Sequence, residues 1–315
     1  MLHLLRTVPG FRRLFLAHTV SRAGDAFNTV ALVVLVFELT GSGIGVAGAV
    51  MFEVVPVLLL GTLAGWAADR LPRRSLMVGA DLFRASVAMA LVLVSGSVAV
   101  AFAVAFGLSL GAVAFNPAAA SLLPDLVGED DVVAANSAMW TAAVVAQIAL
   151  APAAGLVIVA WGAPVAFALN AATFVVSALL LVGLRAGRTP ADPGATGRAG
   201  VLGGIMVVRA DPLLRRLVVV QALASLSAGA TSGLLVVLAD RWMGLGPGGF
   251  GLLLAAIGTG AALGPLLLRR FIRPGDKRWL FGPLAVRGGV DLSLAAVANP
   301  VFAGGALVAY GMSTS

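Results

Sequence analysis

The sequence predicts an all-α integral membrane protein with about ten transmembrane helices. Three observations support this fold class: 60% of the 315 residues are hydrophobic, only 11% are charged, and long apolar runs recur from end to end. A soluble domain has roughly 25% charged residues, whereas a helix of about 20 apolar residues crosses the hydrocarbon core of a bilayer. The composition therefore excludes an ordinary soluble domain.

The apolar runs place six spans before a polar stretch and four after it. We expect spans near residues 14–37, 44–67, 75–95, 98–118, 134–160, 164–184, 214–238, 248–269 and 279–297, with a tenth beginning near 301. The first run is too long to be the apolar core of a cleavable signal peptide. We therefore expect a six-helix bundle over 1–184, a cytoplasmic linker over 185–211 and a partial second bundle over 212–315.

The basic residues set the expected orientation. Loops on the same side of the membrane as the N-terminus hold 17 of the 21 Lys and Arg residues, and such a bias places the N-terminus in the cytoplasm. The net charge of +7 would suggest nucleic acid in a soluble protein, but here it suits anionic lipid and topology. We expect a monomeric, multi-pass protein of the cytoplasmic membrane that contacts membrane lipids and no nucleic acid.

Several classes of chemistry have no support in the residues. The chain has no cysteine and only two histidines, His3 and His18, so no disulfide and no metal site is expected. It has no phosphate-binding loop, and we expect no cofactor. Gly107 to Gly111 matches the G-x-S-x-G string of serine hydrolases, but it lies within an expected helix rather than a strand-to-helix turn. We therefore expect no enzyme.

An internal repeat relates the two parts of the chain at a constant offset of 203 residues. The clearest matches are Pro9 with Pro212, Arg12 with Arg215 and Arg13 with Arg216. Two six-span halves in the same orientation form the parallel repeat of one large transporter class. Two full copies would need about 406 residues by this repeat logic, so we expect a chain truncated before spans eleven and twelve.

The turn after span two carries the most specific motif. Gly65 to Met77 reads G-x-x-x-D-R-x-P-R-R-x-x-M, which resembles the loop signature of the major facilitator superfamily. The resemblance implies that Asp69 faces the start of span eleven and that Arg70, Arg73 and Arg74 tie helix ends together at a cytoplasmic gate. The alternative is that the arginines are only positive-inside anchors, which leaves Asp69 and Gly65 unexplained.

Two charged residues of span three are expected in the same gating region. Asp81 and Arg84 lie at i and i+3 early in that span, a spacing that places them on one helical face. We assign them to the cytoplasmic charge cluster around Asp69 and Arg70.

Span one carries an unusual polar face. His18, Arg22, Asp25 and Thr29 follow one another at steps of 4, 3 and 4 residues, and Asn28 flanks them. A charge in mid-membrane costs about 2.5–3.5 kcal/mol, so these groups should face a cavity or a partner. A buried carboxylate can exchange a proton, and our hypothesis is that Asp25 takes up the coupling proton while Arg22 tunes it. The alternative is a static Arg22–Asp25 pair that fixes helix packing.

Two further ionisable positions stay open. Glu53 lies near the middle of span two and is either a second proton or cation site or a structural partner of Arg22 or Arg84. In span nine, Arg287 and Asp291 are four residues apart, and the sequence does not choose between pairing and binding.

Span five contains Ala151-Pro152-Ala153-Ala154-Gly155. This string resembles the superfamily's antiporter signature, G-P-x-x-G-G, and implies a helix bend at Pro152 and Gly155 that favours export. Ordinary small-residue packing is the alternative. Leu122 to Val127 and the Thr40-Gly41-Ser42 turn resemble the enterobactin-exporter-like branch of drug-efflux proteins.

The resemblance implies a secondary active transporter. We expect proton-coupled efflux of an amphipathic small molecule, such as a drug, a siderophore or another metabolite. Its central cavity is expected among spans one, two, four, five, seven and eight, with Asp25 and Glu53 as the ionisable groups. The alternatives are an importer or uniporter of the same fold and a truncated remnant that does not transport.

Overall fold

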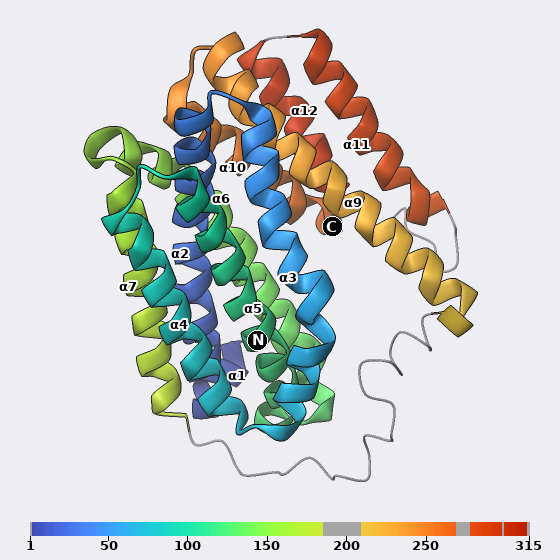
Figure 1. Ribbon diagram of the computed structural model, residues 1–315. Coiled ribbons are helices and arrows are strands. Elements are labelled where there is room, and N and C mark those ends of the chain that lie inside the picture. The colour runs from blue at the N-terminus through green and yellow to red at the C-terminus, as the bar shows by residue number, and fades with distance from the viewer. Residues whose placement is uncertain (1, 185–208, 269–277, 298, 314–315) are drawn as a thin grey trace.

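The computed structural model describes residues 2–184, 209–268, 278–297 and 299–313, and the regular secondary structure in these ranges is helical (Figure 1). The helices of the first half are α1 (Leu2–Thr7), α2 (Pro9–Thr40), α3 (Gly43–Arg70), α4 (Arg73–Leu93), α5 (Val98–Val127), α6 (Val132–Trp161) and α7 (Ala163–Val182). Those of the second half are α9 (Pro212–Val237), α10 (Gly246–Leu268), α11 (Arg278–Ala296) and α12 (Pro300–Met312). The all-α membrane fold class is confirmed.

Each expected span coincides with one of these helices. The short helix α1 was not expected. Within the described residues, six helices are long and apolar enough to cross a membrane, and all six lie between Pro9 and Val182. Two shorter apolar stretches, Gly249–Gly264 and Pro300–Met312, lie in the second half. Most of the expected linker, 185–208, is outside the described residues.

The helix ends follow local chemistry at the turn between α2 and α3. Gly41 has a φ of 62° and ends α2 in the left-handed conformation, which glycine adopts without steric cost. Ser42 then caps α3, because its hydroxyl accepts a hydrogen bond from the Ile44 amide at 3.1 Å. Two residues are thus enough to reverse the chain direction.

The internal repeat is visible in where the helices begin. Pro9 and Pro212 both start a helix at its first position, where a proline has no amide hydrogen to lose. Gly43 and Gly246, the first residues of α3 and α10, are separated by the same offset of 203 residues. The repeat that the sequence predicts therefore corresponds to equivalent helices.

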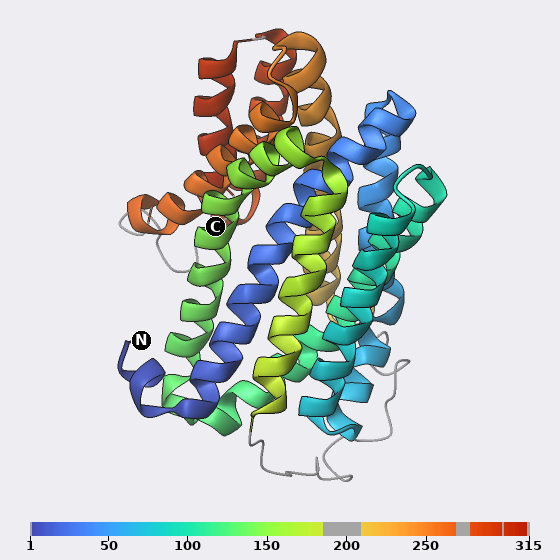
Figure 2. The ribbon, with the colours of Figure 1, turned by 90° about the vertical axis from the view of Figure 1, so that its left-hand side faces the viewer.

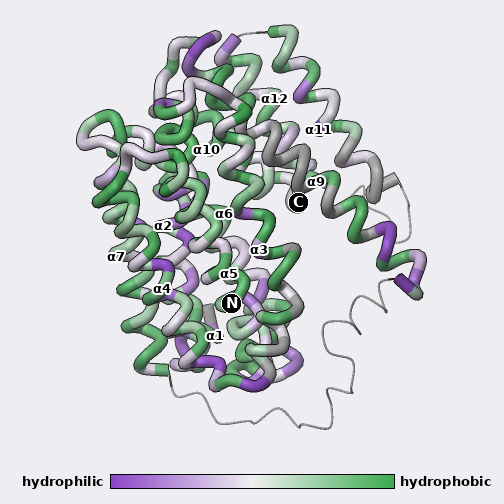
Figure 3. Tube along the Cα trace, in the orientation of Figure 1, coloured by the Kyte–Doolittle hydropathy of each residue, from purple (hydrophilic) through white to green (hydrophobic). Residues whose placement is uncertain are grey.

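The helices of the first half form a bundle in which α2 packs against α6 and α7, α4 against α5 and α7, and α3 against α5 (Figures 1 and 2). In the second half, α10 packs against α12. The two halves meet where α10 lies along α6 and where α9 crosses α3. Hydrophobic residues cover most of the helices, and hydrophilic segments lie at the lower end of the bundle, at its top and at the outer end of α9 (Figure 3).

Candidate functional site

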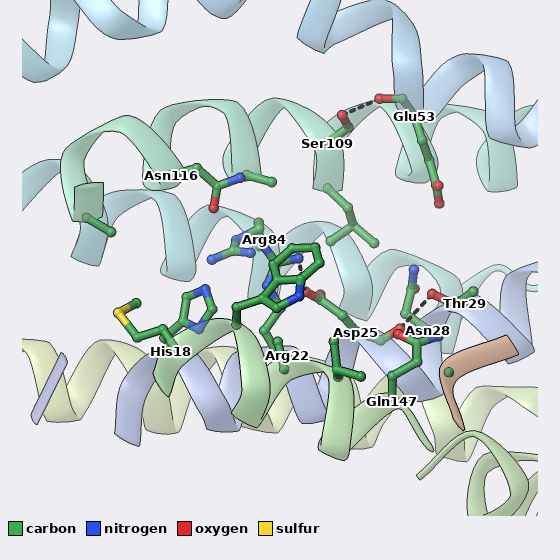
Figure 4. A pocket seen from close by; sticks show the side chains of 18 of the residues that line it. His18, Arg22, Asp25, Asn28, Thr29, Glu53, Arg84, Ser109, Asn116 and Gln147 are labelled. Atoms are coloured by element: carbon green, nitrogen blue, oxygen red, sulfur yellow. Dashed lines mark hydrogen bonds and ion pairs between the residues drawn. The ribbon is translucent and has the colours of Figure 1, made fainter. Parts of the chain in front are cut away.

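A cavity of about 690 Å³ lies among α2, α3, α4, α5 and α6, with α10 closing it from the second half (Figure 4). This volume is in the range of pockets that hold small organic molecules. Its polar lining consists of His18, Arg22, Asp25, Asn28, Thr29, Glu53, Arg84, Ser109, Asn116, Asn136 and Gln147. The side chains of 224–230, in the middle of α9, are outside the described residues, so the expected lining by span seven stays untested.

The polar face of α2 lies on this cavity. His18, Arg22, Asp25 and Thr29 all line it, as their helical spacing predicts. The guanidinium of Arg22 is 3.5 Å from the carboxylate of Asp25, and the Thr29 hydroxyl donates to the Asp25 backbone carbonyl at 2.9 Å. The ion pair is loose and keeps contact with the cavity, because both side chains are about one-third exposed.

Glu53 reaches the cavity from α3, on the opposite wall (Figure 4). The Ser109 hydroxyl of α5 donates to the backbone carbonyl of Glu53, which fixes α3 at this level. Among the described residues the ion pairs are Arg22–Asp25, Arg73–Asp125 and Arg84–Asp81, so the Glu53 carboxylate is in none of them. The alternative in which Glu53 pairs with Arg22 or Arg84 is therefore not what the structure shows.

The placement of Asp81 and Arg84 in the cytoplasmic charge cluster is wrong. Arg84 lines the central cavity, and it forms a buried ion pair with Asp81, whose carboxylate also accepts a hydrogen bond of 2.6 Å from Ser177 of α7. The Arg84 guanidinium packs over two rings, 4.9 Å from the centroid of Phe115 and 4.3 Å from that of Phe174. Packing against α5 and α7 directs the pair inward, away from the turn.

In the motif turn between α3 and α4, Arg73 pairs with the carboxylate of Asp125. Arg73 donates to Asp125, near the end of α5, and to the Ser121 carbonyl at 2.9 Å. This joins the start of α4 to the end of α5, as the family resemblance implies for one of its arginines. A side chain added at Gly65 would meet nothing within 4 Å. The Asp69 side chain is outside the described residues, so its expected role stays a prediction, as do those of Arg70 and Arg74.

The proline motif of span five lies where the two halves touch. Ala151 and Ala154 are fully buried, and Gly251 of α10 packs on the backbone of Ala151 and Pro152 so closely that an added Cβ would overlap them. Pro152 and Gly155 are within α6. Close packing between halves thus accounts for the small residues here, and the antiporter role stays a prediction.

Further contacts between the halves lie near the α2–α3 turn. A Cβ added at Gly43 would lie 3.1 Å from the Gly233 carbonyl oxygen, and one at Gly233 would lie 2.9 Å from that of Gly43. Arg241, in the π-helical turn Leu238–Trp242 that follows α9, donates to the Gly41 carbonyl at 2.6 Å. The halves are therefore joined at the membrane side opposite the N-terminus.

The cavity reaches the other side, where the N-terminus lies. Its lining extends to Asn136 and Trp140, on the first turns of α6, and Trp140 is 66% exposed. The closed seam at one side and the exposed lining at the other correspond to a cavity that opens toward the N-terminal side.

Sequence analysis missed part of the polar lining. Asn116, Gln147 and Ser109 are polar residues inside apolar runs, a signal that alone marks a functional position in a membrane helix. In span nine, Asp291 accepts a hydrogen bond from Thr231 of α9 at 3.0 Å, and the Arg287 guanidinium lies 5.4 Å from the Tyr310 ring centroid. Within the described residues these two charges make no ion pair with each other.

Comparison with known proteins identifies the architecture. The structure is similar to a variant of the nucleoside transporter NupG, with a TM-score of 0.78 and 12% identity over 96% of this chain and 79% of that one. A bacterial homologue of the human lysosomal transporter Spinster, inward-facing and unoccupied, gives 0.71 and 16% over 96% and 72%. The peptide transporter POT in complex with sulfate gives 0.66 and 15% over 97% and 80%. These identities show the fold alone.

No curated protein sequence matches the chain. Its sequence does match a family model described as transmembrane secretion effector, over residues 5–311. That match covers nearly the whole chain, and the fold agrees with it. The chain belongs to the transmembrane secretion effector family of major facilitator transporters.

Proposed function

We propose that this transporter exports an amphipathic small molecule from the cytoplasm and is driven by the proton gradient. The observation that carries the proposal is the cavity between the halves, which combines two carboxylates, Asp25 and Glu53, with an apolar wall. The family description as a secretion effector and the proline motif of α6 support the outward direction.

The proposed transport proceeds by alternating access. In this state the seam of Gly43, Gly233 and Gly251 closes the side opposite the N-terminus, and substrate enters from the cytoplasmic side that we assign to the N-terminus. Rocking of the halves opens the seam and exposes Asp25 and Glu53 to the other side. A proton taken up there by a carboxylate favours release of the substrate, and its return to the cytoplasm resets the cycle.

The test is transport by the purified chain in proteoliposomes with an imposed pH gradient. A fluorescent amphipathic dye that reports accumulation should move against its gradient only when the proton gradient is present. Transport that is independent of the gradient would favour a uniporter, and dye moving in the same direction as the protons would favour an importer. Absence of any transport would favour the remnant.

The carboxylates are tested by replacement. Asp25→Asn and Glu53→Gln keep the shape of the side chain but remove the exchangeable proton, so each should abolish uphill transport while dye binding remains measurable. Because Asp25→Asn leaves Arg22 without its partner, the double variant Arg22→Gln/Asp25→Asn serves as a control for the unpaired charge. Full proton-driven transport by Asp25→Asn would remove this residue from the coupling mechanism.

A further inference from the structure

The ionisable side chains of the cavity change in sign along its length. His18 and Arg84 lie toward one end and Glu53 toward the other, with the Arg22–Asp25 pair between them (Figure 4). The Arg22 guanidinium is 3.5 Å from the Asp25 carboxylate, so the two regions meet at this pair. One cavity thus has a basic region and an acidic region.

The basic region contains buried donors that the protein does not use. The Nε of Arg84 is buried and has no hydrogen-bond partner among the described residues, although its Nη2 pairs with Asp81 and the whole residue is only 4% exposed. The Nδ1 of His18 is also buried and without a partner among the described residues, and it can donate in one of the two imidazole tautomers. An unpaired buried polar atom is costly, and the neighbouring arginines make an anionic oxygen the most favourable partner.

The acidic region contains hydrogen-bond acceptors rather than donors. The Glu53 carboxylate is in no ion pair among the described residues, and Asp25 has only its loose contact with Arg22. The Oδ1 of Asn28, which also lines the cavity, is buried and has no hydrogen-bond partner in the described part of the chain. These are all acceptors, so a positively charged donor such as an ammonium group would complement them.

We propose that the cavity binds a zwitterionic substrate whose anionic group lies at Arg84 and His18 and whose cationic group lies at Glu53 and Asn28. This rests on the proposed function and narrows its substrate class. Arg84 is then a determinant of specificity, held in place by Asp81 and by the rings of Phe115 and Phe174.

Helix geometry gives a scale for the separation of the two regions, because α2 contributes residues to both. His18 and Asp25 are seven residues apart on α2, and a rise of 1.5 Å per residue places them about 10 Å apart along the helix axis. The apolar lining of the cavity includes Leu108, Leu254 and Ile257. The substrate should therefore carry its charges at opposite ends of an apolar body.

The test compares three forms of one probe, norfloxacin, whose carboxylate and secondary amine lie at opposite ends of an aromatic body. The parent is zwitterionic near neutral pH, its ethyl ester is cationic, and its N-acetyl derivative is anionic. Binding to the full chain in nanodiscs is measured by fluorescence titration. The zwitterion should bind about tenfold more tightly than either derivative, since each loses one charge-assisted contact. Tryptophan, whose two charges share one carbon, should bind more weakly than norfloxacin.

Variants assign each charge to its region. Glu53→Gln should weaken binding of the zwitterion about tenfold and leave binding of the N-acetyl form unchanged. The double variant Asp81→Asn/Arg84→Gln removes both charges of the buried pair together, and it should weaken the zwitterion but leave the ester unchanged. Arg22→Gln is a second probe of the basic region that does not disturb the buried pair. Arg12→Gln and Glu38→Gln, both at exposed positions of α2, are the matched controls.

The outcomes separate this inference from the proposed function. Equal binding of all three forms would contradict a zwitterionic substrate but would remain compatible with the export of amphipathic compounds. An ester that binds as tightly as the parent would contradict the anion site at Arg84 and His18. An N-acetyl form that does so would contradict the cation site at Glu53 and Asn28. Equal losses in the control variants would overturn the assignment of residues. Absence of binding by every form would count against both the inference and the proposed cavity function.

Discussion

Two ion pairs with the same spacing occupy very different surroundings in this molecule. Arg22–Asp25 on α2 and Asp81–Arg84 on α4 are both three residues apart. The first is loose at 3.5 Å, and its side chains are 38% and 31% exposed; the second is closed, and its side chains are 5% and 0% exposed. The difference shows that spacing alone brings charges together, whereas the neighbouring helices decide whether water can reach them.

The surroundings predict different roles for the two pairs. Ser177 donates to Asp81, and the rings of Phe115 and Phe174 pack on Arg84, so breaking that pair should cost folding free energy. The α2 pair contacts the cavity, so breaking it should change transport with little effect on folding.

The largest expected effect is the loss of one partner of the α4 pair. Arg84→Met leaves the Asp81 carboxylate charged and uncompensated in a buried site, which should lower the free energy of unfolding by about 3–5 kcal/mol. SDS denaturation in mixed micelles measures this change. Asp81→Asn/Arg84→Gln removes both charges and should recover much of the loss. A destabilisation below that of Arg22→Gln would contradict the structural role of the pair.

The hydrogen bond from Ser177 is the next contribution. Ser177→Ala removes the donor that lies 2.6 Å from Asp81, and a buried hydrogen bond to a charged group contributes about 1.5–3 kcal/mol. The same denaturation measurement applies. Ser86→Ala is the control, because the Ser86 hydroxyl is exposed and bonds only to carbonyls of its own helix. Equal effects of the two variants would show that the Asp81 contact adds no stability.

A third variant tests the space that holds Arg84. A Cβ added at Gly111 would overlap the aliphatic part of Arg84, whose Cδ would lie 2.9 Å away. A Cβ added at Gly79 would meet no atom of the described residues within 4 Å. Both Gly→Ala changes gain similar helix propensity, so the difference between them isolates the overlap. Gly111→Ala should be less stable than Gly79→Ala by about 1–3 kcal/mol. Equal unfolding free energies would mean that Arg84 moves aside without cost.

The sequence predicts the helices well, because the length and apolar composition of a run are enough to indicate a transmembrane helix. The polar face of α2 was also predictable, since four polar residues at helical spacing inside an apolar run have to share a cavity or a partner. Both predictions use information within one helix.

What lies between helices was not predictable in the same way. Asp81 and Arg84 are close in sequence to the basic turn at 70–74, and nothing in α4 shows that they face Ser177 and Phe174, almost a hundred residues away. Likewise, the packing of Gly251 against Ala151 pairs two positions that a single sequence does not connect. These contacts depend on how helices are arranged, and that arrangement decides which charges are structural.

The smallest expected effect on stability belongs to the α2 pair, and it is the most informative. Asp25→Asn breaks a partly exposed pair, which contributes about 0–1 kcal/mol, so the free energy of unfolding should stay near that of the unsubstituted chain. Proton-driven transport in proteoliposomes should nevertheless be lost, because the amide takes up no proton. If Asp25→Asn instead destabilised the chain as much as Arg84→Met while transport persisted, the α2 pair would be the static element and Glu53 would be the remaining carboxylate for coupling. The contrast between the two pairs is thus decided by measuring stability and transport on the same variants.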